Sequence, residues 1–328
     1  MITVPTTLVL GAGASKPYGF PSGYELRKYL CDPNFLSLMP QFGFDVDELT
    51  VFMKTFLKSE MTSIDAFLAR RGNDKVRLNS LHTYADIGKA AIAYCLIQNE
   101  QPEKLHITTD DHWYQYLWSF IADSLESFGE NKLSIITFNY DRSLEFYLLT
   151  ALQNSFGISA QVAAEHLKKI PILHVYGQLA ALPELSQPGS GSLHYRHDIV
   201  DPASIAMAAS GIRVIDEGRD DDDVFEQAYL YLSAAQRICF LGFGFDPTNV
   251  RRLRIDQLMK EIKAREENAP LMFATTIGLE KAEQLSVINK LSTARFFGDQ
   301  NPAQENIGNH GDLKTERYLR ATGVFIPS

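Results

Sequence analysis

Short apolar runs that recur between longer helical patterns constrain the fold of this chain most. The runs have almost no polar break, as in SIITF and ICFLGF. Such continuity is typical of parallel strands buried on both faces, because crossover helices cover both sides of a parallel sheet. The expected strands are 7–10, 133–138, 171–176, 212–215, 237–243, 271–275 and 294–297. The sequence therefore predicts an α/β fold, a mostly parallel sheet with helices on both faces.

Helical periodicity fills most of the remaining sequence. The expected helices are 46–59, 62–71, 81–99, 112–128, 141–154, 222–235, 248–267 and 279–291. More than a hundred residues with a helical pattern separate the first two expected strands, so we expect 24–129 to be an inserted helical subdomain. The α/β domain would then comprise 1–23 and 130–300, and 301–328 would form a C-terminal extension.

Composition and charge limit the possible partners and compartment. The 328 residues are 45% hydrophobic and 22% charged, as in folded proteins, and the net charge of −9 disfavours nucleic-acid binding. The three cysteines, Cys31, Cys95 and Cys239, are far apart, which argues against a CxxC zinc module and a disulfide framework. The sequence shows neither a signal peptide nor a run of ~20 apolar residues. We therefore expect a cytoplasmic protein without membrane partners.

The first expected strand runs directly into a glycine-containing turn. Gly11, Ala12, Gly13 and Ser15 belong to the sequence GAGAS. Glycines allow a sharp turn and a close approach to a ligand, while free N–H groups and the Ser15 hydroxyl can bind phosphate oxygens. A dinucleotide fingerprint would have a third glycine where this chain has Lys16. A tight turn without a ligand remains the alternative.

The second expected strand ends in Thr137 and is followed by Asn139 and Asp141. In open parallel sheets, ligands bind at the carboxyl ends of the strands, so these side chains lie at the productive edge. Two structural roles compete with this interpretation. Asp141 could be a helix N-cap, and Asn139 could be a turn former.

Two further strand ends carry polar residues and glycines. His174, Tyr176 and Gly177 end the third expected strand, and the period of two places His174 and Tyr176 on one face. A histidine in an apolar strand is also often a satisfied core residue. The strand at 237–243 is followed by an aspartate that could bond sugar hydroxyls. The residues at this end are Gly242, Gly244 and Asp246.

The ordered set GAGAS, TFNYD, HVYG and LGFGFD resembles the sirtuin-like superfamily, and most of all its bacterial branch of NAD-hydrolysing antiphage effectors. The resemblance covers about 1–23 and 130–300, and IDAF at 64–67 is similar to a motif in the helical insertion of that branch. It implies a Rossmann-like NAD-binding domain. It further implies an NAD glycohydrolase that cleaves NAD⁺ to nicotinamide and ADP-ribose and requires no metal.

The resemblance also implies roles for the strand-end residues. Asn139 would hold a ribose hydroxyl and the attacking water, and Asp141 would orient the nicotinamide side or fix the loop. His174 is our candidate base, although a strict alignment of the H-G motif places Tyr176 at that position. The glycine turn would hold the pyrophosphate, and Asp246 the adenosine ribose. The candidate NAD-binding residues are Gly11, Ala12, Gly13, Ser15, Thr137, Tyr176, Gly177, Gly242, Gly244 and Asp246.

The implied partners are further copies of the chain, a hexameric ATPase or translocase encoded nearby, and a phage-derived trigger, because unregulated NAD hydrolysis would harm the cell. Two other functions stay open. One is a sensor that binds NAD or ADP-ribose without turnover. The other is a zinc-less NAD-dependent protein deacylase, which the missing four-cysteine module disfavours.

Overall fold

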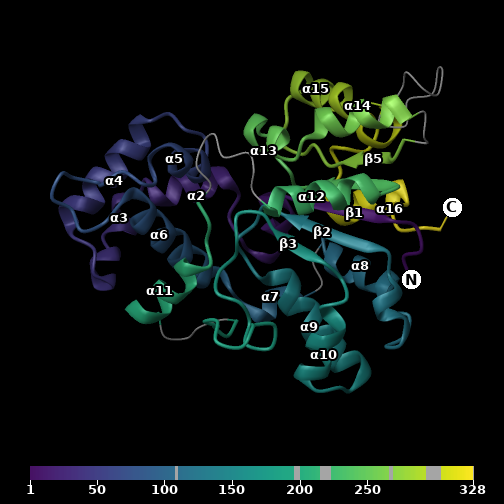
Figure 1. Cartoon of the computed structure of the whole chain (residues 1–328), viewed down its shortest axis with the longest axis horizontal. Coiled ribbons are helices and arrows are strands. Elements are labelled where there is room, and N and C mark those ends of the chain that lie inside the picture. The colour runs from purple at the N-terminus through teal and green to yellow at the C-terminus, as the bar shows by residue number, and fades with distance from the viewer. Residues whose placement is uncertain (108–109, 196–199, 215–222, 266–268, 293–303, 328) are drawn as a thin grey trace.

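A five-stranded, all-parallel sheet forms the centre of the chain, with the strand order β3-β2-β1-β4-β5 (Figure 1). The computed structural model describes residues 1–107, 110–195, 200–214, 223–265, 269–292 and 304–327. The strands are β1 (Thr6–Leu10), β2 (Leu133–Thr137), β3 (Ile172–His174), β4 (Arg237–Leu241) and β5 (Leu271–Ala274). In register, Thr137 lies opposite Leu10 and His174, which aligns the carboxyl ends of three strands. The predicted α/β fold with a parallel sheet is confirmed.

Helices make up most of the remaining described structure. In the N-terminal third they are α1 (Ala12–Ser15), α2 (Gly23–Leu30), α3 (Pro33–Leu36), α4 (Val46–Lys58), α5 (Ile64–Arg71), α6 (Tyr84–Asn99) and α7 (Pro102–His106). Further along are α8 (Trp113–Ile121), α9 (Ser143–Phe156), α10 (Ala160–Leu167), α11 (Pro202–Ser210), α12 (Asp223–Ala234), α13 (Pro247–Arg252), α14 (Ile255–Arg265), α15 (Lys281–Leu291) and α16 (Thr315–Thr322). Short 3₁₀ turns cover Lys16–Tyr18, Met39–Phe42 and Ser127–Glu130, and Gln304–Gly308 forms a π-helical turn.

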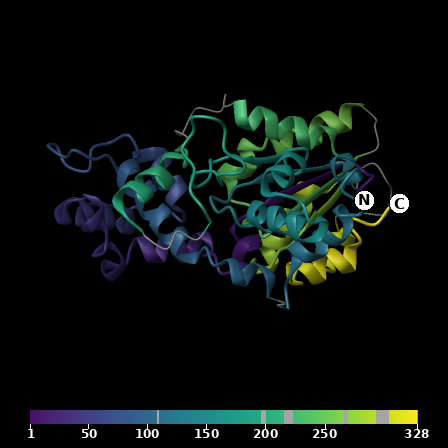
Figure 2. The ribbon, with the colours of Figure 1, turned by 90° about the horizontal axis from the view of Figure 1, so that it is seen from below.

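Helices cover both faces of the sheet, as predicted. On one face, the Thr7 hydroxyl of β1 donates to the Tyr231 carbonyl of α12 at 3.0 Å. Figure 2 shows α12 and α14 along this face and α16 with α8 on the other. The backbone N–H of Ala274 in β5 donates to the Tyr318 hydroxyl of α16 at 2.7 Å, so the C-terminal segment packs onto the sheet. Both chain ends lie at the amino ends of the strands, away from the edge that carries the candidate residues (Figure 1).

Helices α2 to α6 gather beside the sheet (Figure 1). Within this group, α4, α5 and α6 share an aromatic core. The rings of Phe52, Phe56, Phe67 and Tyr84 pack with centroids 4.8–6.2 Å apart. Helix α11, far along the sequence, packs on α6. Helix α8, although it lies within 24–129, belongs to the sheet layers: its Trp113 Nε1 donates to the Ala14 carbonyl at 2.8 Å.

Several sequence expectations differ from the structure or fall outside its described residues, and three of them concern the C-terminal half. No strand forms at Ile212–Val214, where Ile212 makes only an isolated bridge to Gly177, and Ile215 lies outside the described residues. The expected helix at 248–267 divides into α13 and α14, because Arg254 adopts a left-handed conformation with φ +53° that ends the first helix. The expected strand at 294–297 falls outside the described residues. Within the described part of the chain, no helix combines the length and apolar character needed to cross a bilayer.

Candidate active site

The glycine turn after β1 packs directly against the end of β4. The N–H of Gly11 donates to the Leu241 carbonyl and that of Gly13 to the Gly242 carbonyl, both at 3.0 Å. A Cβ on Gly11 would lie 2.5 Å from the Gly242 oxygen, and Gly242 itself has φ +57°. These glycines are therefore required for the close approach of two backbones. Their N–H groups are already bonded, which removes two of the donors expected for a phosphate.

Asn139 joins the glycine turn to the end of β2. Its Nδ2 donates to the Gly11 carbonyl and to the Ser15 hydroxyl, each at 3.0 Å, and its backbone N–H donates to Thr137 Oγ1 at 3.1 Å. The oxygen of the same carboxamide is not bonded in this way. Asn139 Oδ1 is buried and has no hydrogen-bond partner among the residues that the structure describes. A buried acceptor without a partner is costly unless a ligand satisfies it.

Asp141 is buried at the start of α9. Its Oδ1 accepts hydrogen bonds from the backbone N–H of Ser143 at 3.1 Å and from the Ser143 hydroxyl, which is also 2.7 Å from the Tyr114 hydroxyl. Burial raises the pKa of Asp141, and hydrogen bonds from Ser143 and Ser15 only partly oppose this effect. The N-cap of α9 is Arg142, so Asp141 precedes the cap that the structural alternative assigned to it, and it bonds Ser143 in the first turn. It also presents a carboxyl group with a perturbed pKa.

His174 is held between two acceptors. Its Nδ1 lies 2.8 Å from the Asn139 carbonyl oxygen and its Nε2 lies 2.5 Å from Glu145 Oε1. Burial lowers the pKa of His174, but the Glu145 carboxylate and the Asn139 carbonyl outweigh burial, and the net pKa is raised. An imidazolium donates from both nitrogens and has no lone pair to accept a proton. Both ring nitrogens therefore face oxygen acceptors, and this geometry favours the protonated form of His174.

These side chains enclose one small cavity. Its volume is about 10 Å³, room for about a single water molecule. The lining residues are Leu10, Ser15, Tyr114, Thr137, Asn139, Asp141, Leu144, Glu145, Ile172 and His174. The structure therefore brings together all three candidate catalytic residues with Ser15 and Thr137. Sequence reasoning missed Glu145, because it lies inside the apolar helical pattern RSLEFYLL and no turn or strand end marks it.

Tyr176 lies in a different neighbourhood from His174. Strand β3 ends at His174, and the Gly177 N–H closes a turn onto the His174 carbonyl at 3.1 Å, with Gly177 at φ +68°. The Tyr176 hydroxyl donates to Asn249 Oδ1 at 2.5 Å and accepts from Arg252 Nη1 at 2.6 Å, both in α13. The expected common face of His174 and Tyr176 is not observed, since strand alternation stops where the turn begins.

The end of β4 leads to a helix cap. Asp246 Oδ1 accepts hydrogen bonds from the backbone N–H groups of Thr248 and Asn249 at 2.9 and 3.3 Å, and so caps α13. A Cβ added at Gly244 would meet no atom within 4 Å. Gly244 and Asp246 are not among the residues that line the small cavity.

A hydrogen bond joins the helical insertion to the site. The Tyr140 hydroxyl, between Asn139 and Asp141, donates to the partly buried carboxylate of Asp65 in the first turn of α5. Burial raises the pKa of Asp65, while the Tyr140 hydroxyl and the nearby Arg252 guanidinium lower it. Asp65 belongs to the IDAF segment, and that motif was its only signal in the sequence.

Comparisons and metal-ligand geometry assign no further chemistry. No family model matches the sequence, and no curated protein is significantly similar to it. Across the described ranges, no three His, Cys, Asp or Glu side chains are grouped so that they could hold a metal ion. The geometry of the strand ends and the order of their motifs are therefore the features that bear on function.

Proposed function

We propose that this chain is an NAD glycohydrolase that cleaves NAD⁺ to nicotinamide and ADP-ribose. The observation that carries the proposal is the buried Oδ1 of Asn139, an acceptor without a partner among the described residues. It shares one cavity with the carboxyl groups of Asp141 and Glu145 at the carboxyl ends of parallel strands. The order of GAGAS, TFNYD, HVYG and LGFGFD supports the same proposal through its resemblance to sirtuin-like NAD hydrolases.

The proposed chemistry needs little beyond these groups. Cleavage of the nicotinamide–ribose bond develops positive charge on the ribose, which nearby carboxylates stabilise. Water forms a bond to the ribose C1′ as the C1′–N bond breaks, and nicotinamide leaves with the electron pair of that bond. In the proposal, Asn139 Oδ1 orients this water or a ribose hydroxyl, and Asp141 accepts the proton. A raised pKa suits Asp141 for this task, since a general base is most effective near the working pH.

His174 has a positioning role in this proposal. As an imidazolium bonded to Glu145 and to the Asn139 carbonyl, it fixes the backbone that carries the Asn139 carboxamide. A positioning role fits the two contacts of His174 better than the role of general base does. To act as a base, His174 would first have to give its Nε2 proton to Glu145.

The small cavity also bears on regulation. A volume of about 10 Å³ does not admit a ribose ring, so substrate entry requires residues that line the cavity to move apart. A site that must open suits an enzyme whose activity is gated. We therefore infer a cytoplasmic effector of a bacterial antiphage system, activated by homo-oligomerisation, by an ATPase or translocase partner, or by a phage-derived trigger.

The decisive experiment measures nicotinamide and ADP-ribose release from NAD⁺ by the purified full chain, with and without phage lysate and an acyl-lysine peptide. Asn139→Ala and Asp141→Asn should each lower the rate of release by about 10²-fold or more. Asn154→Ala, an exposed asparagine on α9 whose Nδ2 bonds only the Thr150 carbonyl of its own helix, is the matched control and should retain it. NAD⁺ binding without release under every condition would replace the enzyme with a sensor. Release only with peptide would indicate a deacylase.

A further inference from the structure

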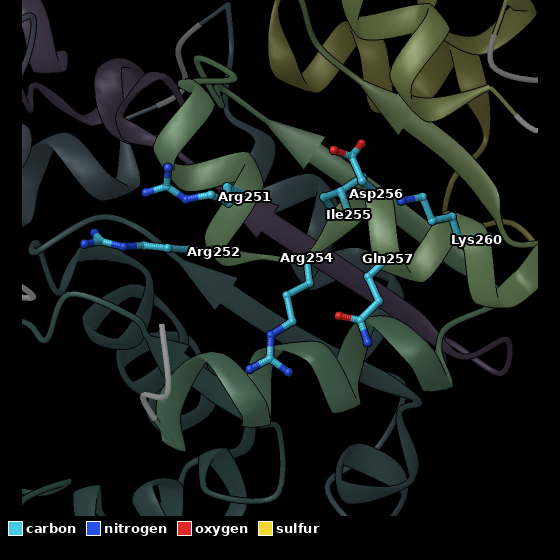
Figure 3. A pocket seen from close by; sticks show the side chains of 7 residues that line it. All are labelled: Arg251, Arg252, Arg254, Ile255, Asp256, Gln257 and Lys260. Atoms are coloured by element: carbon cyan, nitrogen blue, oxygen red, sulfur yellow. The ribbon is translucent and has the colours of Figure 1, made fainter. Parts of the chain in front are cut away.

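A second and much larger cavity opens where α13 meets α14. Its volume is about 500 Å³, within the ~300–1,000 Å³ typical of small-molecule sites. Its lining contains four cationic side chains, those of Arg251, Arg252, Arg254 and Lys260, and one carboxylate, that of Asp256 (Figure 3). Ile255 and Gln257 complete the lining. A concave surface with this charge balance favours an anionic ligand.

Two of the arginines are held in place by neighbouring elements. Arg252 is buried, donates from Nη1 to the Tyr176 hydroxyl at 2.6 Å, and stacks 5.5 Å from the Tyr176 ring centroid. Arg254 donates from Nη1 to Glu226 Oε2 of α12 at 2.6 Å. Figure 3 shows Arg254 extending toward α12, whereas Arg251 and Arg252 extend together in another direction. Side chains that are already positioned lose less entropy when a ligand binds.

The glycine turn after β1 offers few free hydrogen-bond donors to the phosphate groups of a ligand. The N–H groups of Gly11 and Gly13 are bonded to β4, and the Ser15 hydroxyl accepts from Asn139. The arginines at α13 and α14 provide planar guanidinium groups, which bind phosphate oxygens in pairs. Glu226 and Asp256 offset part of this charge and leave the cavity lining cationic.

We propose that this cavity binds the phosphate groups of a small phosphorylated molecule, with a nucleotide diphosphate as the chemical class. The concave shape and the net charge of −9 favour a small molecule over a nucleic acid. The diphosphate can belong to NAD⁺ itself, which rests on the proposed function, or to a separate nucleotide effector. The phosphate site itself does not depend on NAD⁺ cleavage.

Isothermal titration of the full chain with inorganic pyrophosphate tests the site directly. Wild-type protein should bind pyrophosphate, and the charge reversals Arg251→Glu and Lys260→Glu together should weaken binding by about tenfold or more. Both residues are exposed, so the double variant should fold. Lys290→Glu, an exposed lysine on α15 that is not part of the cavity lining, is the matched control and should bind like wild type. Absent binding, or binding that the double variant leaves unchanged, would overturn the proposal.

Competition identifies the source of the diphosphate. Displacement of pyrophosphate by NAD⁺ assigns the site to the substrate, whereas displacement by ADP but not by NAD⁺ assigns it to an effector. Asn139→Ala should bind pyrophosphate normally, so loss of NAD⁺ cleavage and loss of this site are separate results. A short single-stranded oligonucleotide that outcompetes all of these ligands would contradict the small-molecule site.

Discussion

The Nε2 atom of His174 lies 2.5 Å from Oε1 of Glu145, and this pair joins β3 to α9 in the lining of the candidate site. The other ring nitrogen contacts the Asn139 carbonyl, so the imidazole faces an acceptor on each side. Only the protonated ring satisfies both contacts at once while Glu145 is ionised. The pair therefore connects the protonation of one buried histidine to the geometry of Asn139.

This pair should make stability depend on pH. Because the folded-state pKa of His174 is raised, its contribution to the free energy of unfolding is fully present below the unfolded pKa of about 6.5 and is lost as pH rises through the folded pKa. The stability difference between wild type and His174→Gln should therefore shrink as the pH rises above about 6.5. Chemical denaturation at several pH values measures it, with His310→Gln as a control for loss of an imidazole. A difference that grows with pH would contradict the ion pair.

The contact between the glycine turn and β4 predicts a contrast between two substitutions. In Gly13→Ala, the added Cβ would lie 2.7 Å from the Gly242 Cα, a backbone atom that cannot move away cheaply. We expect a loss of about 1–3 kcal/mol in the free energy of unfolding, as for other overpacked sites. Gly244→Ala meets no atom within 4 Å and should change stability by less than about 0.5 kcal/mol. Equal effects of the two substitutions would show that the turn and β4 do not touch this closely.

The strands were predictable because an uninterrupted apolar run indicates a strand that is buried on both faces. Strands β1, β2, β4 and β5 lie within or next to the expected ranges. The residues at which helices and strands end were harder to predict. Nothing in the sequence around Arg254 signals a helix break, since neither glycine nor proline occupies the left-handed position. Similarly, the 171–176 run continues past His174, but the turn at Gly177 ends the strand earlier.

The candidate site was predictable in part for a related reason. Strand ends of a parallel sheet must meet at one edge, so Ser15, Asn139, Asp141 and His174 could be grouped from sequence. The residues that hydrogen-bond to these side chains, and so set their chemistry, could not be predicted. Glu145 and Asp65 sit on helices whose position around the sheet depends on packing, and that packing decides that His174 is paired and that Tyr140 contacts the insertion.

A buried ion pair beside the site should be essential for stability. Arg142 is fully buried and donates from Nε and Nη2 to the two Glu100 oxygens at 2.9 and 2.7 Å, and from Nη1 to the Ala180 carbonyl at 2.6 Å. Arg142→Met leaves the Glu100 charge buried and should cost about 3–5 kcal/mol. Replacing Glu100 by Gln in the same chain should recover part of this loss. Denaturant unfolding of both single variants and the double variant checks the coupling; additive losses would contradict it.

The positions of His174 and Tyr176 make it testable which of the two residues supports the proposed reaction. His174 lines the cavity with Asn139, whereas the Tyr176 hydroxyl bonds Asn249 and Arg252 outside it. If the chain hydrolyses NAD⁺ as proposed, Asn139→Ala should lower kcat by about 10²–10³, as expected for loss of a group that orients the reaction. His174→Gln should also lower kcat, because Asn139 loses its backbone support, and should shift the pH profile. Tyr176→Phe should keep kcat near wild type and affect at most KM. The opposite ranking of His174→Gln and Tyr176→Phe would place the reaction on the α13 side of the sheet and assign Tyr176 to the histidine position of the family.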